Sequence, residues 1–183
     1  NIDERHEVRQ RYKHGKEIGG ADIAAHGDVF VISFREQDSV RWLNTEDGSV
    51  EKSVTVPSPR AVEVTPDGKV FVISGTKILT VDRNGTKQTI VEGLVNPVRL
   101  SFDPATEDLL VVEREPDHRI KRYDNQGTLK QTYGREGGRQ DGVYKPENFL
   151  GVTSIVADGK GGFVVAEEKT APRRVARFDA EGE

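Results

Sequence analysis

The 183-residue sequence contains no cysteine, no methionine and a single tryptophan. Without cysteine there is no disulfide framework, no thiol nucleophile and no zinc site with sulfur ligands. No apolar run approaches the roughly 20 residues that a membrane-spanning helix needs, so we expect no membrane span. The formal net charge of −4 argues against nucleic acid as the main partner. These absences leave the compartment open, and we favour an extracellular or periplasmic location over the cytoplasm.

Branched apolar residues dominate what is present. There are 23 valines and 9 isoleucines against 8 leucines, a bias that favours strands over helices. The 19 glycines and 8 prolines provide many turns. No helix-period apolar stripe runs longer than about two turns. The composition therefore predicts an all-β chain, and its length fits one domain over residues 1–183 or a piece of a larger one.

Four segments read alike, each with a short alternating strand, a turn and a more continuous apolar strand. The segments are Gly20–Ser33, Arg60–Ser74, Val98–Glu113 and Thr153–Glu167. A third strand is expected after each of them, at residues 40–44, 78–82, 120–124 and 175–179. The first three repeats continue into a more polar fourth strand, at residues 50–56, 86–91 and 128–133.

The repeats are regularly spaced. The corresponding residues Ser33, Ser74 and Glu113 are 41 and 39 positions apart, whereas Glu167 follows after 54 because residues 135–149 form an inserted loop. A period near 40 residues with four strands is typical of a β-propeller blade. Neighbouring blades cover the inner strands on both faces, while the outermost strand is a solvated edge. We accordingly expect one valine of each second strand to point into the core between blades, namely Val31, Val72, Val111 and Val165. We therefore predict a β-propeller of four-stranded antiparallel blades.

The predicted blades are residues 14–56, 57–95, 96–134 and 150–183. The last of them lacks its outermost strand, and residues 6–13 resemble such a strand without a blade of its own. One interpretation is that this orphan strand completes the last blade and closes a four-bladed ring. Another is that two chains join, so self-association is possible. We favour a third, in which the four blades belong to a larger six-bladed ring, because a sequence without methionine has lost its start.

Residues 113–127 carry an acidic residue, then His-Arg-Ile, then a turn of the form aromatic-Asp-x-x-Gly. Residues 174–182 repeat the second part of this pattern. The pattern resembles the NHL repeat family of six-bladed propellers, closely only in the third and fourth repeats, since Ser33 and Ser74 stand in place of the acid. The resemblance implies a binding platform or scaffold, although some members of that family are enzymes or bind RNA.

Two pairs of opposite charge occupy matching positions on adjacent strands of a hairpin: Glu113 with Arg119, and Glu167 with Arg174. Because the pairing recurs in the repeat, we predict structural ion pairs rather than a substrate site. His118 lies in the loop before the strand at 120–124. It could contact a ligand or act as a base, but no nucleophile pattern accompanies it, so a surface turn is its expected setting.

The insertion at residues 135–149 is the segment most suggestive of function, since loops of this length in compact domains tend to be functional or mobile. Its ligand-binding candidates are Arg135, Arg139, Tyr144, Lys145 and Phe149. This mixture suits a protein partner or a small polar ligand. The two aromatic residues could instead fill the gap between blades, and we place recognition slightly ahead.

Three functions remain open. The preferred one is a non-catalytic binding module without a cofactor. The second is a calcium-dependent enzyme similar to lactonases or hydrolases, which would need inward carboxylates from several blades; the sequence offers Asp22, Glu113 and Glu167. The acidic stretch 103–108 lacks the spacing of a calcium loop, so we assign no metal ligand, although calcium stays possible. The third, an RNA-binding propeller, conflicts with the net charge.

Overall fold

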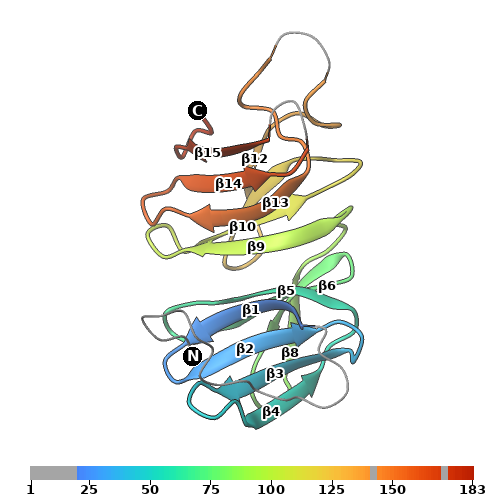
Figure 1. The fold of residues 1–183 in the computed structure, drawn as a ribbon, viewed down its shortest axis with the longest axis vertical. Coiled ribbons are helices and arrows are strands. Elements are labelled where there is room, and N and C mark those ends of the chain that lie inside the picture. Colours follow the sequence, from blue (N-terminus) through green and yellow to red (C-terminus); the bar gives the residue numbers. More distant parts are fainter. Residues whose placement is uncertain (1–19, 141–143, 170–172) are drawn as a thin grey trace, which may run out of the picture.

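Figure 1 shows the computed structural model, which describes residues 20–140, 144–169 and 173–183. The strands are β1 (Gly20–His26), β2 (Val29–Phe34), β3 (Ser39–Asn44), β4 (Val50–Thr55), β5 (Pro59–Val64), β6 (Val70–Ser74), β7 (Lys77–Val81), β8 (Lys87–Val91), β9 (Pro97–Asp103), β10 (Asp108–Glu113), β11 (Ile120–Asp124), β12 (Leu129–Tyr133), β13 (Val152–Ala157), β14 (Phe163–Glu167) and β15 (Arg174–Phe178). In these described ranges no helix is long and apolar enough to cross a membrane.

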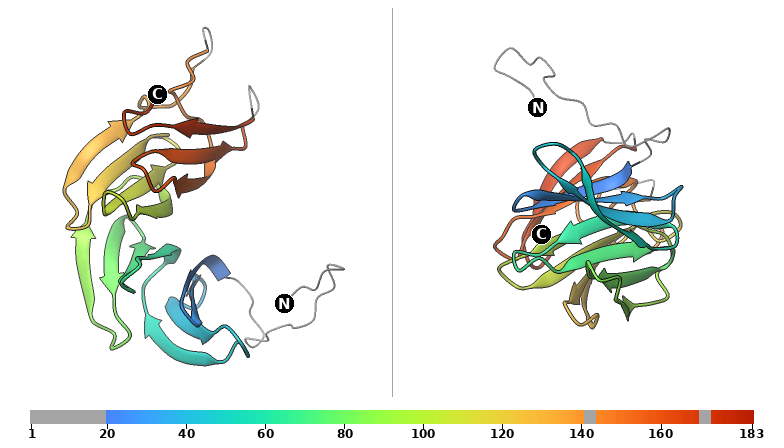
Figure 2. Two further views of the ribbon diagram at one scale, coloured as in Figure 1. Left: turned by 90° about the vertical axis from the view of Figure 1, so that its left-hand side faces the viewer. Right: turned by 90° about the horizontal axis from the view of Figure 1, so that it is seen from below.

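The strands form four antiparallel sheets in which sequence neighbours pair: β1–β4, β5–β8, β9–β12 and β13–β15. We call these sheets blades 1 to 4. The innermost strands β1, β5, β9 and β13 contact one another in that order. Figure 2 shows that the blades form an open arc with blades 1 and 4 at its ends. The predicted all-β propeller fold is confirmed, and blade 4 has three strands within the described residues.

In blade 3, burial is greatest on the second strand and falls toward the outer edge, as the stacking of blades requires. Every residue of β10 is buried, whereas the outermost strand β12 has a single buried residue, Tyr133. The orphan strand expected at residues 6–13 lies outside the described residues. Closure of the ring by that strand, and the larger ring that we favoured, therefore stay predictions.

Side chains of neighbouring blades meet in three apolar cores. Trp42 lies in the core between blades 1 and 2, Phe71 in that between blades 2 and 3, and Phe163 in that between blades 3 and 4. Alternate residues of one strand point to opposite faces, so β6 and β10 each contribute to two cores. The valines that we expected in these cores are at most 1% exposed, namely Val31, Val72, Val111 and Val165. Burial of each contributes about 1.5–3 kcal/mol.

Strand pairing corrects the alignment of the first repeat by one residue. The first residue of the innermost strand pairs with Ser74 in blade 2, Glu113 in blade 3 and Glu167 in blade 4. In blade 1 the corresponding partner is Phe34, not Ser33. A shift of one residue turns every side chain of a strand to the opposite face. The valines of β2 in blade 1 therefore face the following blade, whereas the corresponding valines of β6 in blade 2 face the preceding one.

Candidate functional site

The loops that follow the second and the fourth strand of a blade lie at the same end of the sheets, because successive strands are antiparallel. We call this end the insertion end, since the loop at 135–149 belongs to it. The loops at 35–38 and 114–119 lie there as well. All the ligand-binding residues that we predicted from the sequence belong to this end of the blades.

The residue that ends the second strand attaches its blade to the preceding linker. Glu113 Oε1 accepts the backbone N–H of Val95, and Glu167 makes the equivalent contact in blade 4. In blade 2 the Ser74 hydroxyl instead donates to the carbonyl of Pro57, at 2.6 Å. Proline has no N–H to offer a carboxylate, so a hydroxyl donor fits here. The residue at the acidic position of the repeat thus holds its blade to the preceding linker, and we call this contact the blade latch.

The expected side-chain pair between Glu113 and Arg119 is wrong. The two residues pair through the backbone, where Glu113 N–H donates to the carbonyl of Arg119 at 2.9 Å. The guanidinium of Arg119 turns to Asp117 in its own loop, at 2.5 Å. The buried Glu113 carboxylate contacts Lys121, its diagonal neighbour on the same face of the hairpin. Burial acts to lower the pKa of Lys121, but the bond to Glu113 together with the charges of Glu113 and Asp117 outweighs it and raises that pKa.

Glu167 and Arg174 are opposite each other on β14 and β15, and their side chains are in contact. Arg139 brings a second guanidinium to the same carboxylate, with Nη1 3.4 Å from Oε1. Arg174 also donates to the carbonyl of Asn148 at 3.0 Å and to the Tyr144 hydroxyl at 2.7 Å. This network attaches the insertion to blade 4.

The insertion has a buried half and an exposed half. Phe149 is fully buried, and its ring centroid lies 5.2 Å from that of Phe178 in the core between blades 3 and 4. Arg139 is buried too, beside Glu167. These two residues pack rather than face solvent, which corrects our expectation that they contact a ligand. The exposed candidates are Arg135, Tyr144 and Lys145.

His118 is buried as well, so the expected surface turn is wrong. The loop at 114–119 folds against the insertion, where Gly138 approaches His118 closely at a φ of +72°. A Cβ on this glycine would lie 2.6 Å from the carbonyl oxygen of Phe149, so the contact needs glycine. His118 Nδ1 accepts the N–H of Gly151 at 3.4 Å. Burial lowers the pKa of His118 below its ordinary value.

A hollow of about 230 Å³ lies at the insertion end of the innermost strands. We call it the channel-mouth hollow. All four blades line it, and its polar lining consists mainly of arginines: Arg35, Arg60, Arg99 and Arg114. Our sequence analysis missed these residues because they come from three different repeats. The available signal was a basic residue near the start of β5 and of β9, on strands that are otherwise largely apolar.

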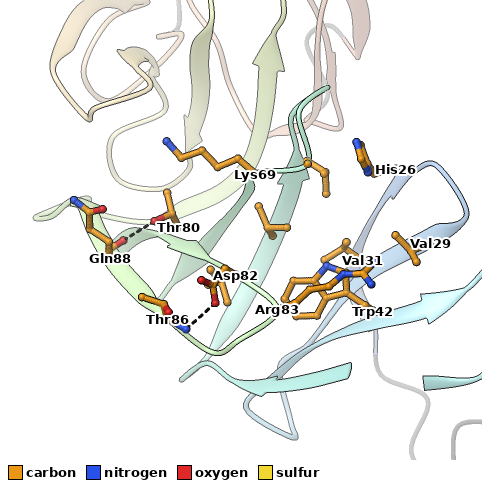
Figure 3. Close-up of a pocket in the computed structure, with 14 residues that line it drawn as sticks. His26, Val29, Val31, Trp42, Lys69, Thr80, Asp82, Arg83, Thr86 and Gln88 are labelled. Carbon is orange, nitrogen blue, oxygen red and sulfur yellow. Dashed lines mark hydrogen bonds between the residues drawn. The ribbon is translucent and has the colours of Figure 1, made fainter. Parts of the chain in front are cut away.

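A larger cleft of about 560 Å³ opens between blades 1 and 2 (Figure 3). Its walls are apolar, with Val31 and Trp42 on blade 1 facing Val70 and Val81 on blade 2. The polar groups at its rim already have protein partners, such as Arg83 with Glu51 and His26 with the carbonyl of Pro66. The cleft is therefore the diverging edge of the core between these blades.

The carboxylates considered for calcium are held by other groups. Asp22 accepts the N–H of Val62 at 3.3 Å, and burial raises its pKa. Asp103 and Asp108 lie beside the buried Arg122, at 3.7 and 3.4 Å from Nη1. In the described part of the chain, no group of three or more His, Asp and Glu side chains is placed to hold a metal ion.

No protein-family model matches this sequence, and no curated protein matches it. Hydrazine synthase of Kuenenia stuttgartiensis is similar in structure, with a TM-score of 0.71 and 19% identity over 96% of this chain and 50% of that one. A catalytically inactive virginiamycin B lyase from Staphylococcus aureus, solved with quinupristin, has a TM-score of 0.68 and 12% identity over 97% and 61%. A chain of a nidogen–laminin complex has a TM-score of 0.60 and 16% identity over 80% and 56%. The chain spans between 50% and 61% of these structures, and at such identities the likeness shows the β-propeller fold alone.

Proposed function

We propose that this chain is a non-catalytic, NHL-like β-propeller module that recognises a protein partner at the exposed half of its insertion. A small polar ligand at the same surface is the alternative. The observation that carries the proposal is the setting of Tyr144. Its side chain is 48% exposed, yet its hydroxyl is fixed by Arg174, which the buried Glu167 anchors in turn.

A fixed, exposed aromatic ring suits recognition for an energetic reason. The guanidinium groups of Arg139 and Arg174 lie 5.7 and 5.8 Å from the Tyr144 ring centroid and help to hold the ring. Little side-chain entropy is then left to lose on binding. Tyrosine is also among the residues that contribute most to protein interfaces. The exposed Lys145 beside it adds a charge that selects a complementary partner.

The enzyme alternative receives less support from the contacts. Glu113 and Glu167, two of its three carboxylates, serve as blade latches and are bonded to backbone N–H groups and to cations. The recurrence of the latch supports the NHL-like part of the proposal. Of the three similar structures reported above, the nidogen–laminin chain carries a description that names a protein complex.

The proposal is tested with Tyr144→Ala and a matched control, Leu129→Ala, which removes a 51% exposed apolar side chain from β12. Immobilised wild-type chain captures partners from an extract of the source, and affinities are then measured with the purified partner. We expect Leu129→Ala to bind like the wild type. Tyr144→Ala should lose about 2 kcal/mol or more of binding free energy.

Three results would contradict the proposal. The first is equal binding by a folded Tyr144→Ala variant. The second is lactone hydrolysis that requires calcium, accompanied by a calcium-dependent rise in the melting midpoint. The third is salt-sensitive retention of RNA, which would favour the nucleic-acid alternative.

A further inference from the structure

The channel-mouth hollow gathers four arginines in a protein of net charge −4. Arg60 and Arg99 project from the innermost strands β5 and β9, while Arg35 and Arg114 come from the loops that follow β2 and β10. Residues of β1 and β13 complete the wall. The hollow is thus built by all four blades, whose arrangement as an open arc Figure 2 shows.

Three of these arginines form no ion pair with an acid in the described part of the chain. Arg60 Nη1 donates to the side-chain carbonyl of Asn96 at 2.8 Å, and Arg99 Nε donates to the carbonyl of Thr153 at 2.9 Å. Both acceptors are neutral. The carbonyl of Arg35 accepts the N–H of Asp38 at 3.3 Å, but no hydrogen bond or ion pair from its guanidinium to a described residue is found. These contacts position the guanidinium groups without neutralising them.

The acids near the hollow do not balance its charge. Arg114 is paired with Glu168 and, at 3.5 Å, with Glu115. Asp22 interacts electrostatically with Arg99, and burial raises the pKa of Asp22 above its ordinary value. Burial, and then the charge of Arg35, lower the pKa of Arg60. The contribution of Arg35 means that the two guanidinium groups lie close enough to repel each other.

Like charges held together in a hollow repel each other and are destabilising. An anion that enters the hollow relieves this repulsion, and its attraction to the arginines grows as water is displaced. The planar fork of a guanidinium matches the oxygens of a carboxylate or a phosphate group. We infer that the channel-mouth hollow binds a small oxyanion, a carboxylate or a phosphate group, through Arg35 and Arg60 with support from Arg99. Sites for drug-sized ligands usually measure about 300–1,000 Å³, so this smaller hollow suits an anion of few atoms.

The test is calorimetric titration of the purified chain with inorganic phosphate and, separately, with succinate, in chloride buffer. The variants are Arg35→Gln and Arg60→Gln, with Arg83→Gln as the matched control, because Arg83 lies in the turn after β7 at the opposite end of the blades. We expect the better of the two anions to bind about tenfold or more weakly to either hollow variant and unchanged to Arg83→Gln. The two arms distinguish a phosphate from a carboxylate ligand.

Melting curves separate loss of the site from loss of the fold. Without an added oxyanion, Arg35→Gln should melt no lower than the wild type, because it breaks no side-chain hydrogen bond to a described residue and removes a repulsion. With the anion, the midpoint of the wild type should rise and that of Arg35→Gln should not. The inference is wrong if neither anion binds, if Arg35→Gln binds as tightly as the wild type, or if Arg83→Gln weakens binding equally. It does not depend on the proposed function, since Tyr144→Ala should retain anion binding.

Discussion

Blades 1 and 2 contain the same five residues in their second strands and use them differently. Val29–Ser33 and Val70–Ser74 both read Val-Phe-Val-Ile-Ser. In blade 2 the four apolar residues are all at most 2% exposed, because blades 1 and 3 cover both faces of β6. In blade 1 the two valines are buried while the Phe30 and Ile32 side chains are only half-buried. Burial is set by the neighbours of a strand as well as by its residues.

The register of the two strands differs as well. A tight turn at Gly27–Asp28 joins β1 to β2, whereas five residues, 65–69, separate β5 from β6. Through this shift the valines of blade 1 and those of blade 2 face each other in one shared core. Identical strand sequences can therefore place corresponding side chains on opposite faces of their blades when the preceding turn differs in length.

The largest expected effect is that of Val72→Asp. Val72 is fully buried between blades 1 and 2, and an unpaired carboxylate there costs several kcal/mol, comparable to the ~5–15 kcal/mol stability of a domain. We expect the variant to be unfolded by circular dichroism. Ile32→Asp, on the half-buried face of blade 1, serves as the control and should stay folded. A soluble and cooperatively folded Val72→Asp protein would mean that this strand is not in the register described above.

A smaller effect should separate the two isoleucines of the shared sequence. Ile73→Ala deletes a fully buried side chain from the core between blades 2 and 3 and should cost about 2–5 kcal/mol. Ile32→Ala deletes the same atoms from a half-buried position and should cost about 1 kcal/mol or less. Denaturant unfolding of both variants gives the difference. Equal losses would show that the outer face of blade 1 is as well covered as the centre of blade 2.

Local patterns were sufficient to predict the architecture. Alternating strands, turn dipeptides and a period near 40 residues are encoded within each repeat, so the four blades and the buried valines could be anticipated. The register of blade 1 could not, because Val29–Ser33 aligns perfectly with Val70–Ser74 in sequence. Only the pairing of Gly20 with Phe34 reveals the shift.

Side-chain partners that depend on distant segments were the hardest to predict. Arg119 was expected to reach Glu113, but Asp117 in its own loop was the nearer acid. Phe149 was expected to contact a ligand and His118 to lie in a surface turn, but Phe149 packs in the core between blades 3 and 4 and His118 lies against the insertion. The arginines of the channel-mouth hollow are spread over residues 35–114 and converge only when the blades stack.

The smallest expected effect concerns the turns that follow the third strands of blades 1 and 2. In blade 2, Asp82 Oδ1 accepts the N–H groups of Asn84 and Thr86, both at 2.9 Å. In blade 1 the uncharged Asn44 holds the corresponding turn by accepting the N–H of Glu46 at 2.8 Å. The bond from Thr86 N–H, followed by smaller contributions, lowers the pKa of Asp82 below its ordinary value. The two turns therefore differ in their response to acid.

The sign of this response follows from the lowered pKa. The stabilisation by Asp82 is complete above the ordinary carboxyl value of about 3.9 and is lost as the pH falls through the lower value of the folded chain. An NMR titration should show the amide signals of Asn84 and Thr86 moving below that ordinary value. The amide of Glu46, bonded to Asn44, should not follow the same transition. Asp82→Asn makes the blade 2 turn resemble that of blade 1 and should abolish the movement while leaving the fold intact. If the signals of Asn84 and Thr86 instead titrate at the ordinary carboxyl value, Asp82 does not hold this turn as a charged acceptor, and the contrast between the two blades disappears.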